Sequence, residues 1–351
     1  MTLATLFEQN GCILADPDIL QPAEPFLNAA GEAFRKSLFV TARNNGETLC
    51  LRPEFTIPVC LNHSEGAARY HYQGTVFRQS AAARDAKPQE FEQAGVEALG
   101  ETDYAKADAD MVRLALEAVR SLSDIKPVVH IGDPAFFNAL VGPIGLPEIW
   151  RERLRRAFGD AALLDGMLER MVSAPQIEDA HFKSDDVESL SEEVRAMMST
   201  HGVLGVGGRN PDEIAERYLK KRKEQVSVSA NVKEICQRFL ALECASEEVG
   251  DTMSAFGKEN GIDFSQEIQA YEDRAKGLKD IDADITFAAS FGRRLDYYTG
   301  FVFEISDGSP RDKGPLAGGG RYDGLTELLG GKAMPAVGFS LWLDRLDGGA
   351  S

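Results

Sequence analysis

The sequence predicts an α+β fold, in which an antiparallel sheet is flanked by helices and interrupted by a helical insertion. Paired strand-like runs joined by turn residues fill the first third of the chain. Mostly helical patterns follow, and strand-like runs return in the last 70 residues. A helix-rich block between two β-rich blocks indicates an inserted domain. The predicted segments are a first core part at 1–147, the insertion at 148–277 and a second core part at 278–351.

The β-rich first third is predicted from two strand pairs. Residues 38–41 and 48–51 flank the turn Asn44-Asn45-Gly46. An Asn-Gly pair between two such runs is a strong hairpin signal, because both residues accept positive φ. Residues 70–77 and 90–99 form the second pair, joined by a polar loop. These hairpin signals favour an antiparallel sheet.

Helical and strand patterns alternate in the rest of the chain. The apolar spacing is helical over 104–122, and 127–131 is a short strand. Asn210, followed by Pro211 and Glu213, is a good helix start, with Asn as the N-cap and Glu three residues later. We expect strands again at 301–305 and 336–340, and a helix at 341–346.

Composition narrows the classes of function. Lys and Arg number 38 against 56 Asp and Glu, which gives a formal net charge of -18. Such acidity disfavours nucleic-acid binding, which depends on positive charge at phosphates. The sequence has no apolar run long enough for a membrane span, and we expect no signal peptide. Its five cysteines and five histidines lack metal-ligand spacing, so we expect a cytoplasmic protein without a metal or cofactor.

Three polar segments are candidates for chemistry. Two of them are triplets with the i, i+2, i+4 spacing that places side chains on one face of a strand. These triplets are Arg52, Glu54, Thr56 and Gln93, Gly95, Glu97. The third, 292–300, concentrates arginines, an aspartate and tyrosines beside a strand, where burial requires partners or a ligand. For each triplet alone, a solvated sheet face is the competing interpretation. The glycine-rich stretch 205–209 reads as a loop.

Taken together, these segments resemble the histidyl-tRNA synthetase family, a class II aminoacyl-tRNA synthetase group. The resemblance covers residues 5–135 and 284–347 and weakens in the helical middle. The matching stretches, in family order, are 11–25, 51–56, 77–78, 90–97, 293–299, 303–304, 317–325, 335–339 and 344–346. Phe55 departs from the pattern, because glycine is usual at its position. The resemblance implies a class II synthetase-like antiparallel sheet.

The same resemblance implies a pocket for the three polar ends of L-histidine. Carboxylate and amide oxygens suit the ammonium, a carboxylate and phenols suit the imidazole, and a guanidinium suits the carboxylate. The residues, in that order, are Glu54, Thr56 and Gln93, then Glu97, Tyr298 and Tyr322, and finally Arg293.

The ATP side departs from the family. The acid expected two residues after Arg78 is Ser80, and the loop that follows is poor in arginine. Trp342 stands where a glycine ahead of the run containing Arg345 would let adenine approach. Arg78, Trp342 and Arg345 therefore mark a degraded ATP pocket. The alternative is that the indole points into the core and the pocket survives.

These departures favour a regulatory protein over an enzyme. A histidine pocket, a degraded ATP site and the expected lack of an anticodon-binding domain resemble the regulatory subunit family of the two-component ATP phosphoribosyltransferase. That family pairs with a short catalytic subunit in the first step of histidine biosynthesis. The segment 11–25 would then form a homodimer interface within a hetero-oligomer, and histidine would act in feedback inhibition. The alternatives are a truncated synthetase-like enzyme that still activates an amino acid with ATP, and a synthetase core assisted by a separate tRNA-binding chain.

Overall fold

The computed structural model describes residues 1–29, 32–79, 89–173, 182, 184, 186–200, 210–223, 228–292, 297–308 and 314–346. The described chain separates into two compact units. Unit 1 comprises 1–140, 158–160 and 238–351, and unit 2 comprises 141–157 and 161–237. Helices α12 (Val249–Asn260) and α13 (Ser265–Lys276) belong to unit 1, although they lie within the insertion predicted at 148–277. The domain limits at 148 and 277 stay a prediction.

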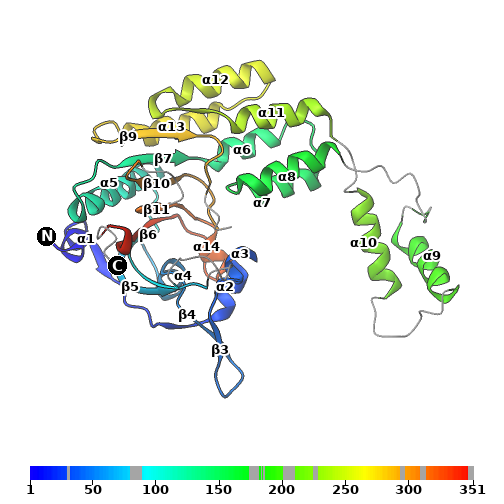
Figure 1. The fold of residues 1–351 in the computed structure, drawn as a ribbon, viewed down its shortest axis with the longest axis horizontal. Helices are drawn as coiled ribbons and strands as arrows, with labels where there is room; N and C mark the ends of the chain where they lie inside the picture. Colours follow the sequence, from blue (N-terminus) through cyan, green and yellow to red (C-terminus); the bar gives the residue numbers. More distant parts are fainter. Residues whose placement is uncertain are drawn as a thin grey trace. The chain divides into compact units, whose positions relative to one another are not determined.

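A nine-stranded sheet, mostly antiparallel, is the centre of unit 1 (Figure 1). Only the β1–β5 and β7–β9 pairs are parallel among the described strands. The strand order is β1-β5-β6-β12-β11-β10-β7-β9-β8. In that order the strands are Cys12–Leu14, Ala68–Phe77, Glu90–Leu99, Ala336–Trp342, Ala317–Arg321, Val302–Ser306, Val128–Gly132, Asp284–Ala288 and Glu243–Ala245. The predicted antiparallel α+β class is confirmed.

A small second sheet carries the predicted first hairpin. Its order is β2-β4-β3, formed by Leu20–Pro22, Thr48–Leu51 and Val40–Ala42. The turn closes with a hydrogen bond from the Arg43 amide to the Glu47 carbonyl at 2.9 Å, and Gly46 has φ 86°. The positive φ explains why a glycine occupies this position.

The remaining helices of unit 1 surround these sheets. They are α1 (Leu3–Gln9), α2 (Ala23–Ala29), α3 (Glu32–Arg35), α4 (Thr56–Asn62), α5 (Tyr104–Leu122), α14 (Leu325–Leu328), α15 (Leu343–Leu346) and the 3-10 turn η1 (Ser246–Glu248). The predicted helix at 341–346 is partly wrong, because β12 continues to Trp342 and α15 begins at Leu343. The strand extends because Leu341 and Trp342 pair with Ala94 and Gln93 of β6.

One face of the sheet is covered by α5, which supplies the main apolar packing. On β6, Ala94, Val96 and Ala98 are fully buried, and on β12 their direct partners are Leu341, Phe339 and Val337. Paired residues of an antiparallel sheet point to the same side. The α5 face is therefore apolar, whereas the opposite face carries Gln93 and Glu97 together with an apolar cluster that includes Tyr72, Val76 and Leu99.

Buried ion pairs join the two chain segments of unit 1. Asp108 of α5 bonds Nε of Arg274 at 2.8 Å and Nη2 of Arg321 at 2.6 Å. Arg274 also bonds Asp133 at 3.1 Å. Each of these four side chains is buried, so removing Asp108 would take a shared partner from two buried guanidiniums.

Unit 2 is helical. It contains α7 (Glu148–Ala157), α8 (Ala161–Val172), α9 (Val187–Thr200) and α10 (Pro211–Lys223); α6 (Pro134–Val141) and α11 (Ala230–Leu240) cross its limits. At the start of α10 the Glu213 amide donates to Asn210 Oδ1 at 2.7 Å, and the Asn210 amide donates back to Glu213 at 3.3 Å. The helix start predicted at Asn210 is confirmed as a reciprocal cap. The loop predicted at 205–209 lies outside the described residues. Within the described ranges, no helix is long and apolar enough to cross a membrane.

Candidate functional site

A buried carboxylate, Glu97, is the centre of a hydrogen-bonded cluster on the open face of the sheet. Its Oε1 accepts from the Thr56 hydroxyl at 2.7 Å and from the Tyr72 hydroxyl at 3.2 Å. Its Oε2 accepts from the Tyr322 hydroxyl. Glu97 is 1% exposed. Three donors from β5, α4 and the residue after β11 therefore orient one carboxylate that water does not reach.

Burial governs the electrostatics of this cluster. It raises the pKa of Glu97 from 4.5 to about 8, against the opposing effect of the three hydroxyl donors. Burial also raises the pKa of Glu54, whose charge adds to the shift of Glu97. Two nearby buried carboxyls repel when both are ionised, so a cation between them would be favoured. The site is therefore suited to a ligand that brings positive charge or several N–H donors.

Strand β6 places its polar residues as the alternation predicted. Gln93, Gly95 and Glu97 face away from α5, and β12 places Trp342, Ser340 and Gly338 directly beside them. A Cβ on Gly95 would lie 2.4 Å from the Tyr72 hydroxyl oxygen, and one on Gly338 would lie 1.8 Å from Glu97 Oε2. Larger residues at these two positions would displace the cluster.

The strand interpretation of Arg52, Glu54 and Thr56 is wrong. Strand β4 ends at Leu51, and Thr56 is the first residue of α4. The Glu54 carboxylate accepts from the amides of Thr56 at 2.6 Å and Ile57 at 2.9 Å. It thus satisfies amides that the first turn of a helix leaves unpaired, which bends the chain out of the strand. Glu54 and Thr56 still reach the site, whereas Arg52 packs on the Phe55 ring.

Gln93 adds an unsatisfied acceptor to the same face. Its side chain is 1% exposed, and its Oε1 is buried without a hydrogen-bond partner among the described residues. A buried amide oxygen left unpaired costs about 1–3 kcal/mol. A ligand with an N–H donor at this position would remove that penalty.

Three tyrosines form an aromatic wall beside Glu97. The ring centroids of Tyr297 and Tyr322 are 5.9 Å apart, and those of Tyr298 and Tyr322 are 6.4 Å apart, both edge-to-face. Tyr298 and Tyr322 are the two predicted phenols, and Tyr297, part of the candidate segment 292–300, was not assigned to the pocket. Arg293, predicted to bind a carboxylate, lies outside the described residues.

The three residues predicted for a degraded ATP pocket lie at one end of the sheet, where β5 ends and β6 begins. Arg78 follows β5, donates from Nε to the Pro53 carbonyl at 2.8 Å, and lies 5.3 Å from the Phe91 ring centroid. Trp342 pairs with Gln93 and is half-buried. The Arg345 guanidinium lies 4.9 Å from the Trp342 ring centroid. The indole stands on the same face as Glu97, away from the core side occupied by Leu341.

Sequence reasoning also missed Tyr72 and Ser340, whose hydroxyl oxygens are 2.8 Å apart. The pairing of β5 with β6 places Tyr70, Tyr72 and Gly74 opposite Glu97, Gly95 and Gln93. The alternation Tyr-x-Tyr-x-Gly was a usable signal. Using this signal requires the register of the β5–β6 hairpin, and the polar loop between the two strands does not define that register.

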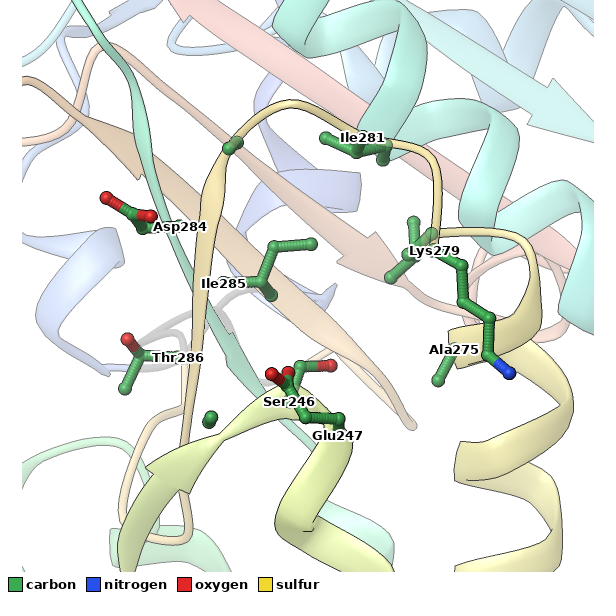
Figure 2. A pocket seen from close by; sticks show the side chains of 11 residues that line it. Ser246, Glu247, Ala275, Lys279, Ile281, Asp284, Ile285 and Thr286 are labelled. Carbon is green, nitrogen blue, oxygen red and sulfur yellow. The ribbon is translucent and has the colours of Figure 1, made fainter.

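A separate pocket of about 570 Å³ lies elsewhere in unit 1, beside the outer edge of the sheet (Figure 2). Strand β8 ends at Ala245, which pairs with Thr286, so Asp284 and Ile285 of β9 continue past it. Ser246 and Lys279 are among the other residues that line it, and Ile285 points into it in Figure 2. It is lined by none of the residues predicted for the histidine pocket. Within the described ranges, no group of His, Cys, Asp or Glu is arranged to hold a metal ion.

Comparison with known proteins gives consistent matches along the chain. Residues 1–206 and 212–346 match the family model described as histidyl-tRNA synthetase. The ATP phosphoribosyltransferase regulatory subunit of a Chelativorans species is 42% identical over 361 residues, covering 97% of this chain and 94% of that protein. The protein of the same description from Brucella canis is 40% identical over 349 residues, covering 95% and 92%.

Solved structures show the same fold. A Bacillus halodurans structure described as an ATP phosphoribosyltransferase regulatory subunit/histidyl-tRNA synthetase has a TM-score of 0.62 at 22% identity, covering 98% of this chain and 76% of that one. The histidyl-tRNA synthetase of a Nostoc species has a TM-score of 0.64 at 17% identity, covering 98% and 68%. At these identities the likeness establishes the fold alone, which is that of class II synthetases.

Proposed function

The chain belongs to the family of ATP phosphoribosyltransferase regulatory subunits, which have the histidyl-tRNA synthetase fold, and we propose that it senses L-histidine through the pocket around Glu97. It is a non-catalytic regulatory subunit in histidine biosynthesis. In this proposal L-histidine, the end product of the pathway, binds the pocket around Glu97 and thereby inhibits the first step of the pathway.

The observation that carries the proposal is the buried pair of polar groups on β6. Glu97 is held by three hydroxyls, and Gln93, four residues earlier on the same face, presents an unpaired amide oxygen. An imidazole N–H suits the first and an ammonium suits the second. Glu54 adds a buried carboxylate nearby. Arg293 is assigned to the ligand carboxylate on the resemblance alone.

The ATP half of the site supports sensing over activation of an amino acid. We propose that Trp342 takes the space of adenine, because its backbone pairs with Gln93 on the open face and the Arg345 guanidinium lies over its ring. Arg78 is engaged by the Pro53 carbonyl. Enzymes that transfer phosphoryl or adenylyl groups need fixed positive charge free to meet the phosphates.

We propose a short ATP phosphoribosyltransferase catalytic subunit as the partner, within a hetero-oligomer that also contains a homodimer of this chain. The homodimer would form through segment 11–25. Its strand β1 is an edge strand, and Ile13 and Leu14 are 60% and 63% exposed. Ile19 and Leu20 of the same segment are each 49% exposed. An exposed edge with apolar side chains is a site for pairing with another chain. We also place the protein in the cytoplasm, because its five cysteines are unpaired.

Separate calorimetric titrations with L-histidine and with ATP test the sensing proposal. We expect saturable 1:1 binding of histidine per chain and no measurable heat with ATP. The assembled complex should be inhibited by histidine with a midpoint that follows this affinity. Tight ATP binding together with histidine-dependent exchange of pyrophosphate into ATP would instead support the synthetase-like enzyme. If histidine inhibits the complex while the isolated chain does not bind it, the sensor lies elsewhere.

A further inference from the structure

Three flat side chains stack beneath the proposed histidine pocket. The Arg52 guanidinium carbon lies 4.0 Å from the Phe55 ring centroid. The Phe55 ring lies parallel to the Tyr72 ring, with centroids 4.3 Å apart and planes 9° apart. Exposure falls along the stack from 5% through 1% to 0%. The chain reaches this arrangement from the turn after β4 and from β5, so the stack joins the two sheets.

The far end of the stack enters the pocket. The Tyr72 hydroxyl crosses over Gly95 and lies 2.8 Å from Ser340 Oγ and 3.2 Å from Glu97 Oε1. Ser340 can donate to the phenol oxygen, which leaves the phenol proton for Glu97 Oε1 at 3.2 Å or the Phe339 carbonyl at 3.3 Å, and we assign it to Glu97 as the nearer acceptor. Burial holds the pKa of Tyr72 well above its ordinary value, which keeps the hydroxyl protonated and a donor.

The near end of the stack is anchored to backbone. Arg52 donates from Nη2 to the Thr75 carbonyl at 3.0 Å and from Nη1 to the Pro17 carbonyl. Its guanidinium stands above Gly74, where a Cβ would come within 3.1 Å of Nη2. Phe55, which replaces the usual glycine of the synthetase pattern, fills the space between this anchor and Tyr72. The Tyr72 side chain is therefore fixed at two places: Phe55 packs on its ring, and Ser340 contacts its hydroxyl.

The fixed Tyr72 hydroxyl determines which acceptor position of the Glu97 carboxylate stays available to a ligand. Each carboxylate oxygen has two acceptor positions. Among the described residues, Oε1 accepts from both Thr56 and Tyr72, which fills it, while Oε2 accepts from Tyr322 alone. The remaining acceptor position of the carboxylate is thus on Oε2.

We infer that Tyr72, pinned by Phe55 and Arg52, is a positioning residue that directs the ligand's imidazole N–H to Oε2 of Glu97 by occupying the second acceptor position of Oε1. This inference rests on the proposed function. The titratable groups facing Glu97 are Glu54 and Cys60 from the α4 region, Tyr72 from β5, Tyr297 from the segment before β10 and Tyr322 from the segment after β11. Only Tyr72 among them belongs to the stack.

Replacing Tyr72 by Phe removes the hydroxyl and keeps the stacked ring. Tyr70→Phe is the matched control, because Tyr70 lies opposite Glu97 on the same strand while its hydroxyl is 3.1 Å from Nδ1 of His63. Tyr72→Phe should weaken histidine binding about tenfold, since the hydrogen bond that holds Oε1 of Glu97 is lost. Tyr70→Phe should leave the affinity within about twofold. Phe55→Leu, which keeps the hydroxyl and loosens the stack, should weaken binding in the same direction.

A ligand-independent measurement decides the inference separately from the proposed function. The carboxyl carbon of Glu97 is followed by NMR in protein labelled with ¹³C-glutamate, and assigned with Glu97→Gln. Loss of a donor to the ionised form should raise the pKa of Glu97 in Tyr72→Phe and leave it unchanged in Tyr70→Phe. If Tyr72→Phe titrates like the wild type, the inference is overturned even when histidine binds. If the wild type binds no histidine, the proposed function fails, and a raised pKa still supports the role of Tyr72 in orienting Glu97.

Discussion

Replacing Glu97 by Gln should change how the stability of unit 1 depends on pH. Burial raises the pKa of Glu97 from 4.5 to about 8. The folded protein therefore binds this proton more tightly than the unfolded chain does. By linkage, stability is highest below the unfolded pKa and is lost as pH rises toward the folded pKa.

The magnitude follows from the size of the pKa change. A difference between 4.5 and about 8 corresponds to about 5 kcal/mol, because each pKa unit is worth about 1.4 kcal/mol. Between about pH 5 and pH 8, the free energy of unfolding of the wild type should fall by about 1.4 kcal/mol per pH unit relative to Glu97→Gln. The pKa of Glu54 is also raised, so the free energy of unfolding of Glu97→Gln should still fall with pH, but less steeply than that of the wild type.

Urea unfolding at several pH values measures this difference. Trp150→Phe as a common background leaves Trp342, in unit 1, as the one tryptophan, so fluorescence reports the unit that contains Glu97. Glu117→Gln, an exposed carboxyl on α5, is the control and should follow the wild type at every pH. Parallel curves for the wild type and Glu97→Gln would refute the reasoning, because Glu97 would then titrate alike in the folded and unfolded states.

Three further predictions concern the pocket and its support. Gly338→Ala should weaken histidine binding at least tenfold, because the added Cβ would lie 1.8 Å from Glu97 Oε2. Gly166→Ala on α8 is the control and should leave the affinity measured by calorimetry unchanged. Asp108→Asn should lower the free energy of unfolding by about 3–5 kcal/mol, since two buried guanidiniums lose their common partner; a urea midpoint equal to the wild type would contradict this. Arg293→Ala should weaken histidine by about a hundredfold and raise the inhibition midpoint of the complex without preventing assembly; an unchanged affinity and midpoint would exclude this pocket as the sensor.

Periodicity predicted the elements well where local signals determine them. The hairpin around Gly46, the β5–β6 pair and helix α5 all follow from turn residues and apolar spacing. The reciprocal cap of Asn210 with Glu213 was visible as a spacing of three residues. These features depend on neighbours in the chain, so a sequence is sufficient to find them.

Features that depend on register or on competing hydrogen bonds were harder to predict. The i, i+2, i+4 pattern at Arg52 was misread, because Glu54 caps α4 and ends the extended run. Tyr72 and Ser340 meet across Gly95 only when β5, β6 and β12 take their observed register. Strand spacing picked out Gln93 and Glu97, but only the resemblance to a known family added Tyr322 and brought the three together, since sequence spacing alone does not show that they converge.

The ion pairs of Asp108 have a consequence for synthesis of the protein. Asp108 and Asp133 are made early, whereas Arg274 and Arg321, which neutralise them in the core, follow more than 140 residues later. A buried carboxylate without its partner is strongly disfavoured. We therefore expect α5 to stay off the sheet until Arg274 has left the ribosome, and the sheet to close only after Arg321, which ends the inner strand β11, has followed. A polypeptide released before Arg321 should be a substrate for chaperones and proteases rather than a competitor for the catalytic partner.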